Sequence, residues 1–303
     1  MAIGDVEPVP GCSDLSYLDT GMYDVAGYGS VYLLDADRPA VVDAGIGADR
    51  EAVFDAVDEH LDGHLEEILL THVHLDHAGG AGYLADRYPE ATVRIHEVGV
   101  PHLVDPDRLV AGTKEAVGDQ WRFYDDPVPI PEDRIDPLAD GDAVDLGDRT
   151  LAVHRAPGHA PHQVAFHDRR DDVVFTGDAA GIWVRGAGDV YPTSPPPQFD
   201  LEECLDDVRH LEDLDPDGLC FGHFGPVTDD VAGVLETYKR TLIEWVEAVR
   251  QRRAALDGDE AVIEDFASSP DPDLVETWGR RKASDELRLN AAGVLRYLDR
   301  VED

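Results

Sequence analysis

Residues 71–80 read Thr-His-Val-His-Leu-Asp-His-Ala-Gly-Gly and place four potential metal ligands within six consecutive positions. Side chains two positions apart on an extended chain point the same way, so His72 and His74 can converge on one ion. Asp76 and His77, which follow the bend, can face a neighbouring ion. Imidazole suits zinc and other first-row metals, whereas a carboxylate also suits harder cations, so the ligand types leave the metal open.

The flanking sequence places this stretch between a strand and a helix. The apolar run 67–71 predicts a short buried strand, and residues 78–88 predict a helix that begins with glycines. The alternative is coincidence in a chain with 13 histidines among 303 residues. Three histidines and an aspartate at these fixed offsets are rarely brought together by chance, so the motif carries little false-positive risk.

The pattern His-x-His-x-Asp-His after an apolar strand resembles the signature of the metallo-β-lactamase superfamily. The resemblance implies further elements in a fixed order, and each of them is present. Ala-Pro-Gly-His ends at His159, the run 173–177 ends before Asp178, and the run 219–222 ends before His223. Upstream, residues 40–45 resemble the first element, whose aspartate, Asp43, supports the ligand loop instead of binding metal. The resemblance spans about residues 15 to 227.

The resemblance also implies the fold, an α/β four-layer αββα sandwich with an added C-terminal helical region. It divides the chain into a metal-binding catalytic domain, residues 1–227, and a helical extension, residues 228–303. Local patterns agree with this: residues 30–34 and 39–43 predict a hairpin, residues 48–61 a helix and residues 92–96 a strand.

The residues make the same case without the family. Several apolar strands each end in a histidine or an aspartate, and loops at one edge of a sheet are where open α/β folds place their sites. A single Gly-His or Gly-Asp after a strand is usually a turn, so His159, Asp178 and His223 would each be structural if taken alone. Together they are better explained as ligands.

The chain is strongly acidic. It carries 65 acidic and 25 basic residues, a formal charge of -40, and its acids are spread along the sequence. Such a surface repels itself at low salt, but at about 1 M salt the Debye length falls to roughly 3 Å. The charge therefore indicates adaptation to a salt-rich cytoplasm, as in halophiles, and it argues against nucleic acid and anionic membranes as partners.

The first ten residues lack a basic and an apolar region, and no run of about 18 apolar residues occurs, so a cytoplasmic location is expected. The cysteines are Cys12, Cys204 and Cys220, an odd and widely spaced set without a Cys-x-x-Cys pair. We therefore expect free thiols and no thiolate metal site.

Two aromatic stretches, 98–129 and 182–199, are expected to be loops that could line access to the site. Tyr191 lies on the loop after Asp178 and could donate a hydrogen bond to a carbonyl oxygen of a substrate, a catalytic role. His162 closely follows His159 and could support a ligand from outside the metal's own coordination shell. The remaining histidines are expected to be packed or solvated, as is usual.

The sequence after residue 200 is helical, with helices expected over 201–211, 227–256, 260–266, 273–281 and 284–301. The apolar face of the last helix packs against the core or against a second copy in a homodimer.

The function that the resemblance implies is two-metal hydrolysis. His72, His74 and His159 would hold the first ion, and Asp76, His77 and His223 the second, with Asp178 and a hydroxide between them. The expected metal is Zn²⁺, with iron as the alternative. The substrate would be a small molecule with an ester-type bond, a thioester as in glyoxalase II or a lactone. Two alternatives stay open: a mononuclear iron sulfur or persulfide dioxygenase of the same fold, and a non-catalytic binding protein, which would be expected to lack ligands.

Overall fold

The structure is a computed structural model that describes residues 2–302. Contacts within the chain divide it into two compact units, each built from segments that are distant in sequence. The division at residues 227 and 228 that the sequence suggests stays a prediction. The segments are, for unit 1, Met1–Arg155, His162–Gly177 and Pro216–Val231, and for unit 2, Ala156–Pro161, Asp178–Asp215 and Ala232–Asp303.

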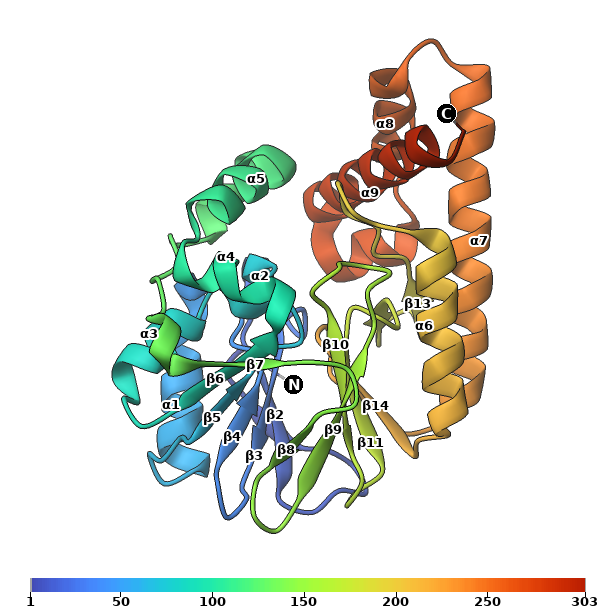
Figure 1. Cartoon of the computed structure of the whole chain (residues 1–303). Helices are drawn as coiled ribbons and strands as arrows, with labels where there is room; N and C mark the ends of the chain where they lie inside the picture. Colours follow the sequence, from blue (N-terminus) through green and yellow to red (C-terminus); the bar gives the residue numbers. More distant parts are fainter. Residues whose placement is uncertain (1, 303) are drawn as a thin grey trace. The chain divides into compact units, whose positions relative to one another are not determined.

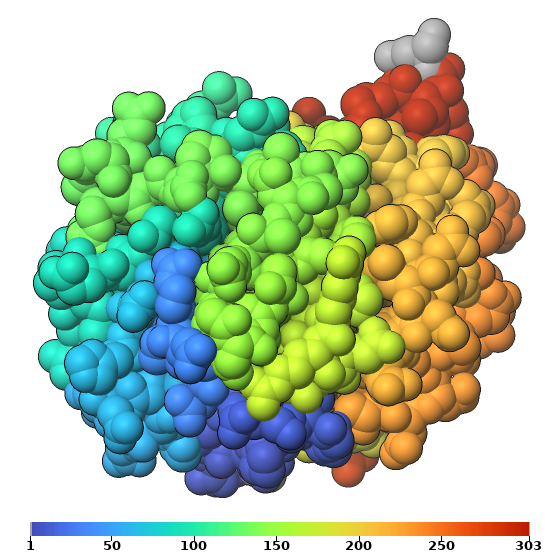
Figure 2. Space-filling model, turned by 60° about the horizontal axis from the view of Figure 1, so that its bottom comes forward, coloured from blue at the N-terminus to red at the C-terminus, as the bar shows by residue number. Residues whose placement is uncertain are grey.

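Unit 1 contains a seven-stranded sheet whose strands follow one another in chain order. The first four strands pair antiparallel and the last four pair parallel, so the predicted hairpin is confirmed as β3 and β4. The N-terminal segment, dark blue in Figure 2, reaches the surface of this unit. The strands are β1 (Val6–Pro8), β2 (Leu15–Asp19), β3 (Ser30–Leu34), β4 (Ala40–Val42), β5 (Glu67–Leu69), β6 (Thr92–His96) and β7 (Ile135–Leu138).

A six-stranded sheet faces the first one within the same unit (Figure 1). Their inner faces share one core, in which Tyr32 of the first sheet meets Phe175 of the second with ring centroids 5.2 Å apart. Burying an aromatic side chain of this kind contributes about 1.5–3 kcal/mol. The strands, in sheet order, are β15 (Pro226–Val227), β14 (Gly218–Phe221), β11 (Val173–Gly177), β10 (Val164–Asp168), β9 (Thr150–Arg155) and β8 (Ala143–Asp145).

Helices cover the outer face of the seven-stranded sheet and form a second core with it. The predicted helix at 78–88 is divided: it begins earlier, at Leu75, and is broken at the glycine pair 79–80. The stretch 98–129 was expected to be a loop, and that expectation is wrong, since it contains two α-helices. The helices of unit 1 are α1 (Arg50–His60), α2 (Leu75–Ala78), α3 (Ala81–Arg87), α4 (Val100–Val104) and α5 (Asp107–Val117).

Unit 2 consists of a small hairpin and four helices (Figure 1). The two helices predicted over 273–281 and 284–301 run as one element with a kink at Gly279, where φ is 75° and ψ is 150°. Glycine tolerates this conformation because it has no Cβ. The elements are β12 (Ile182–Val184), β13 (Asp189–Tyr191), α6 (Leu201–Leu214), α7 (Val231–Ala255), α8 (Asp259–Ser268) and α9 (Pro272–Glu302).

Two further expectations can be checked. The three cysteines are free thiols, as predicted, and Cys204 and Cys220 are buried. Across residues 2–302, no helix combines the length and the apolar character needed to cross a membrane.

Candidate metal centre

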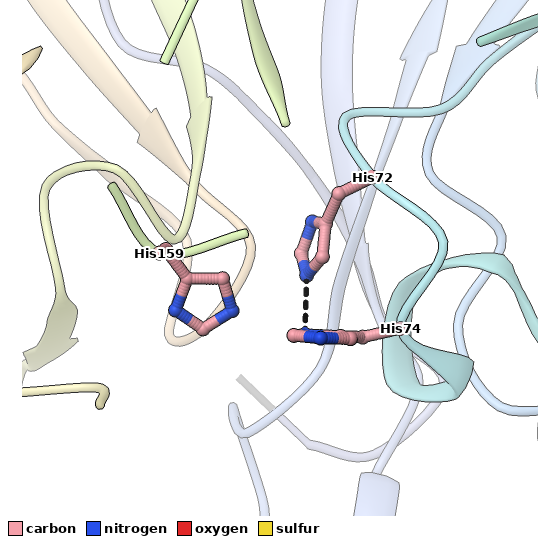
Figure 3. A group of neighbouring side chains, drawn as sticks. All are labelled: His72, His74 and His159. Atoms are coloured by element: carbon pink, nitrogen blue, oxygen red, sulfur yellow. Dashed lines mark hydrogen bonds between the residues drawn. The ribbon is translucent and has the colours of Figure 1, made fainter. Parts of the chain in front are cut away.

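The first pair of predicted ligands lies just beyond the end of β5. The Nε2 atom of His72 and the Nδ1 atom of His74 are 3.1 Å apart, and their rings are nearly perpendicular. Figure 3 shows this contact as a dashed line, and it also draws His159, which belongs to unit 2. The two imidazoles thus converge as the alternation of an extended chain predicts.

A second group in unit 1 is made by Asp76, His77 and His223, which each offer a ligand atom within 4.8 Å of the others. Asp76 and His77 lie in the short helix α2, and His223 follows β14. The two histidines are buried, whereas Asp76 is partly exposed. Nitrogen and carboxylate donors at this separation are able to bind a metal ion.

Asp43 holds the ligand stretch from behind. One carboxylate oxygen accepts the Thr71 backbone N–H at 2.8 Å, and the other lies 2.8 Å from Nδ1 of His77. Because a carboxylate only accepts, Nδ1 of His77 carries the proton and Nε2 carries the lone pair. Asp43 has a left-handed backbone, with φ of 62°, and is buried. Asp43 therefore lies beside the predicted ligands, and its supporting role stays a prediction.

The other buried histidine of this group has a similar partner. Nδ1 of His223 donates to the backbone carbonyl of Tyr28 at 2.8 Å, which again leaves the lone pair on Nε2. The Tyr28 ring packs edge-on against the imidazole, with centroids 4.9 Å apart. A fixed tautomer and a fixed ring orientation are what outer partners supply at metal sites. Sequence reasoning missed Tyr28 because its contribution is a main-chain atom.

A glycine next to His223 leaves room for the neighbouring ring. A Cβ added at Gly222 would lie 2.4 Å from Cε1 of His77. No side chain fits at that distance, so glycine is required for the close approach.

The remaining predicted ligands, His159 and Asp178, lie together in unit 2. Nε2 of His159 is 3.3 Å from Oδ2 of Asp178. Thr193 touches both: its carbonyl accepts from His159 Nδ1 at 3.5 Å, and its hydroxyl donates to Asp178 Oδ2 at 3.5 Å. Both ring nitrogens of His159 thus face acceptor oxygens, whereas His77 and His223 each have an acceptor at Nδ1. The sequence held no signal for Thr193, since it lies 15 residues beyond Asp178 in an irregular segment.

The backbone next to His159 is held by helix α6. The Gly158 N–H donates to the buried carboxylate of Asp207 at 2.7 Å, and the Gly158 carbonyl accepts from Asp200 N at 2.9 Å. A Cβ at Gly158 would lie 2.2 Å from the Cys204 backbone nitrogen. The loop that carries His159 is thus packed directly on the start of a helix.

His162 lies in unit 1, close to the first ligand pair. Its Nδ1 accepts from the Val73 backbone N–H at 3.4 Å, and its ring is stacked 6.2 Å from that of His72. The ring of His102 is a further 6.0 Å away, and burial, with the charge of Arg108 adding, lowers the pKa of His102. The supporting role suggested for His162 remains a prediction.

Tyr191 lies in the hairpin of unit 2. Its ring packs against Trp278 of α9 with centroids 6.1 Å apart, and burial raises its pKa to about 12. A tyrosine that stays protonated can donate a hydrogen bond, but its catalytic role remains a prediction.

Helices α4 and α5 border a small apolar hollow in unit 1. Val73 and Leu75 from the ligand stretch form part of its wall, and His102 is among the lining residues. Val73 alternates with His72 and His74, so it faces away from them. The hollow therefore lies on the side of the ligand stretch opposite to His72 and His74.

Comparisons with known proteins agree with this geometry. A family model described as the Metallo-beta-lactamase superfamily matches residues 24–223. The crystal structure of ST1585, described as an archaeal metallo-beta-lactamase superfamily protein from Sulfolobus tokodaii, superposes with a TM-score of 0.72 at 22% identity. That match covers 94% of this chain and 99% of the other. The expected mixed α/β fold with a C-terminal helical region is confirmed.

Three curated relatives are similar in sequence at lower coverage. The metallo-beta-lactamase fold-containing protein ST1585 of Sulfurisphaera tokodaii is 27% identical over 73% of this chain and 82% of its own length. An acyl-coenzyme A thioesterase, MBLAC2 of Gallus gallus, is 28% identical over 55% of this chain and 62% of its own length. A hydroxyacylglutathione hydrolase of Francisella philomiragia is 28% identical over 61% of this chain and 58% of its own length.

Proposed function

The chain belongs to the metallo-beta-lactamase superfamily, and on this premise we propose that it is a binuclear metal-dependent hydrolase of a small-molecule thioester or lactone. The observation that carries the proposal is the shared tautomer of two buried histidines. His77 and His223 each use Nδ1–H toward an oxygen of the protein and so carry the lone pair on Nε2. Metal-binding histidines in proteins usually donate their second ring N–H to an oxygen in this way, which fixes the tautomer and the ring orientation.

In the proposed site, His72, His74 and His159 would hold one ion, Asp76, His77 and His223 would hold the other, and Asp178 would be a ligand to both. Zinc is the proposed metal because nitrogen and carboxylate donors fit it. When bound, a divalent ion lowers the pKa of water from 15.7 to about 7 and so supplies a nucleophile at neutral pH. The residues themselves orient this chemistry: Asp43 and Tyr28 fix two imidazoles, and Thr193 fixes the third.

The substrate class is proposed from two relatives. One is named an acyl-coenzyme A thioesterase and the other a hydroxyacylglutathione hydrolase, and both names describe thioester hydrolysis. The formal charge of -40 makes nucleic acid a poor substrate. A lactone is the second choice, since the same attack on a carbonyl carbon opens the ring.

The test begins with metal content, measured by mass spectrometry on protein purified in molar KCl. We expect about two zinc ions per chain, and a His77→Ala variant should bind less. His60→Ala is the matched control, because His60 is an exposed histidine at the end of α1. Turnover is then measured on a panel of thioesters, lactones and phosphodiesters. About one iron per chain would overturn the proposal in favour of oxygen-dependent sulfur chemistry.

A further inference from the structure

We infer that Asn290, on helix α9, is a positioning residue for the metal centre, acting on His159 and Asp178 through the loop at residues 193–194. The inference rests on the proposed function, since it takes those two side chains as metal ligands. It gives the C-terminal helix α9 a role in metal binding in addition to its packing within unit 2. All the residues involved belong to unit 2.

Asn290 is buried, with 3% of its surface exposed, and both ends of its side-chain amide make hydrogen bonds. Its Oδ1 accepts from the Ser194 backbone N–H at 2.5 Å, and its Nδ2 donates to Glu286 at 3.2 Å. The other carboxylate oxygen of Glu286 pairs with Lys282 at 2.7 Å. A carboxylate can only accept, so Glu286 fixes the amide with its oxygen toward Ser194.

The Ser194 side chain is held from two helices. Its hydroxyl donates to the Asn290 carbonyl at 3.1 Å and accepts from Nε1 of Trp245, on α7, at 3.1 Å. The backbone is also pressed close to α9, where a Cβ added at Gly293 would lie 1.8 Å from the Ser194 carbonyl oxygen. Ser194 is therefore fixed at its N–H, its hydroxyl and its carbonyl.

The next residue back along the chain transmits this constraint. Thr193 contacts both His159 Nδ1 and Asp178 Oδ2 at 3.5 Å, the long limit of a hydrogen bond. A contact at that limit is lost if the loop moves by a fraction of an ångström. Metal sites lose about 10- to 100-fold in affinity when such outer partners are removed.

A purely structural role for the same network is the competing explanation. Buried polar networks also stabilise folds, and the loss of one member leaves its partner unsatisfied. The two explanations differ in what changes. A structural role lowers the thermal stability of the metal-free protein, whereas a positioning role lowers its affinity for metal beyond what lost stability explains.

The test uses Asn290→Leu, which keeps the side-chain size but removes both amide interactions, and Ser194→Ala, which removes only the hydroxyl. Leu298→Ala is the matched control, because Leu298 is fully buried on the same helix and its side chain has no polar atom. Zn²⁺ affinity is measured by competition with a chromophoric chelator, and thermal unfolding is measured on the metal-free chains. His159→Ala is the reference for loss of a ligand.

We expect Asn290→Leu to weaken the binding of Zn²⁺ by about 10-fold or more, Ser194→Ala to weaken it less, and Leu298→Ala to lower the unfolding temperature without changing the affinity. If Asn290→Leu does not fold, the Zn²⁺ affinity of Ser194→Ala, compared with that of Leu298→Ala, tests the inference instead. Affinities equal to that of the Leu298→Ala control would overturn the inference. If His159→Ala also leaves Zn²⁺ binding unchanged, the proposed function itself fails.

Discussion

The ligands of unit 1 and those of unit 2 are supported in different ways. In unit 1, the buried carboxylate of Asp43 and the main chain of Tyr28 contact the imidazoles at 2.8 Å. In unit 2, the neutral Thr193 reaches both proposed ligands at 3.5 Å. Hydrogen bonds to ionised groups are shorter and roughly twice as strong as neutral ones. The difference teaches that the proposed ligands of unit 1 have short contacts to their supports, while those of unit 2 have long contacts to a loop that packs on α9.

The strongest test of the comparison is to remove the proposed bridging ligand of unit 2. Asp178→Ala should abolish turnover, by more than the roughly 100-fold that loss of an outer partner costs, because a ligand itself is missing. The protein should still fold in high salt. Turnover and circular dichroism are measured side by side, and turnover retained within 10-fold of the parent, roughly 1.4 kcal/mol, would contradict the assignment.

Two glycine substitutions compare the two supports directly. Gly222→Ala places a Cβ 2.4 Å from a carbon of the His77 ring, and Gly158→Ala places one 2.2 Å from the Cys204 backbone nitrogen. Each should displace the adjacent ligand, because neither contact leaves space for a methyl group. We expect Gly222→Ala to lose Zn²⁺ by displacing a ring, and Gly158→Ala to lose both Zn²⁺ and stability, because its clash is with backbone.

Zinc titration and thermal unfolding separate these outcomes. Gly112→Ala is the matched control, since an added Cβ there meets nothing within 4 Å. If Gly222→Ala and Gly158→Ala lose the same amount of stability, the two supports do not differ in the way proposed.

The carboxylate support of unit 1 can be weakened without changing its size. Asp43→Asn replaces an acceptor for His77 Nδ1 by a neutral amide, so the imidazole loses its charged partner. We expect Zn²⁺ affinity to fall by about 10- to 100-fold, at least as much as in Asn290→Leu. Chelator competition measures both variants, and a smaller effect for Asp43→Asn would reverse the ranking of the two supports.

Added salt should raise the thermal stability of the chain. We predict that the thermal unfolding midpoint rises between about 0.1 M and about 1 M KCl, as the Debye length falls from about 10 Å to about 3 Å. The reason is that the charge of -40 repels itself less when it is screened. Exposed ion pairs between the helices of unit 2, such as Arg253 with Asp299 at 2.5 Å, weaken in salt and reduce the gain. A midpoint that falls with KCl would contradict a salt-adapted surface.

The smallest expected effect is that of Asp49, in unit 1, on the pH dependence of stability. Burial, with the charges of Asp24 and Asp19 adding, raises the pKa of Asp49 to about 7. The folded chain then binds this proton more tightly than the unfolded chain, so stability is present at low pH and falls as pH rises from about 4 to about 7. Asp49→Asn should lose less stability between about pH 5 and about pH 8 than the parent, as measured by denaturant midpoints. An equal loss of stability with pH in Asp49→Asn and in the parent would contradict the raised pKa of Asp49.

The parts of the site that could be predicted are those with a local signature. His72, His74, Asp76 and His77 share one stretch, and period-two alternation followed by a bend predicts which of them converge. Asp43 was predicted as a support from the resemblance, but Tyr28, Thr193 and Asn290 were not, because they act through main-chain atoms or lie in stretches with no pattern. The carbonyl of Tyr28 lies 195 positions before His223, and Asn290 lies 96 positions after Ser194.

The helices show the same limit. The stretch 98–129 was expected to be a loop, yet it contains α4 and α5, and α5 has no buried residue. The predicted strand at 92–96 was confirmed with its bounds because its alternation is matched by burial in the sheet.

By itself, the sequence determined the family, the hairpin at 30–43 and the candidate ligands, because periodicity and motif spacing can be read from consecutive residues. Only the tertiary structure decided which atom orients each imidazole and that the C-terminal helices reach the loop beside His159. Those contacts join segments distant in sequence, and packing and hydrogen-bond geometry select them only once the chain has folded.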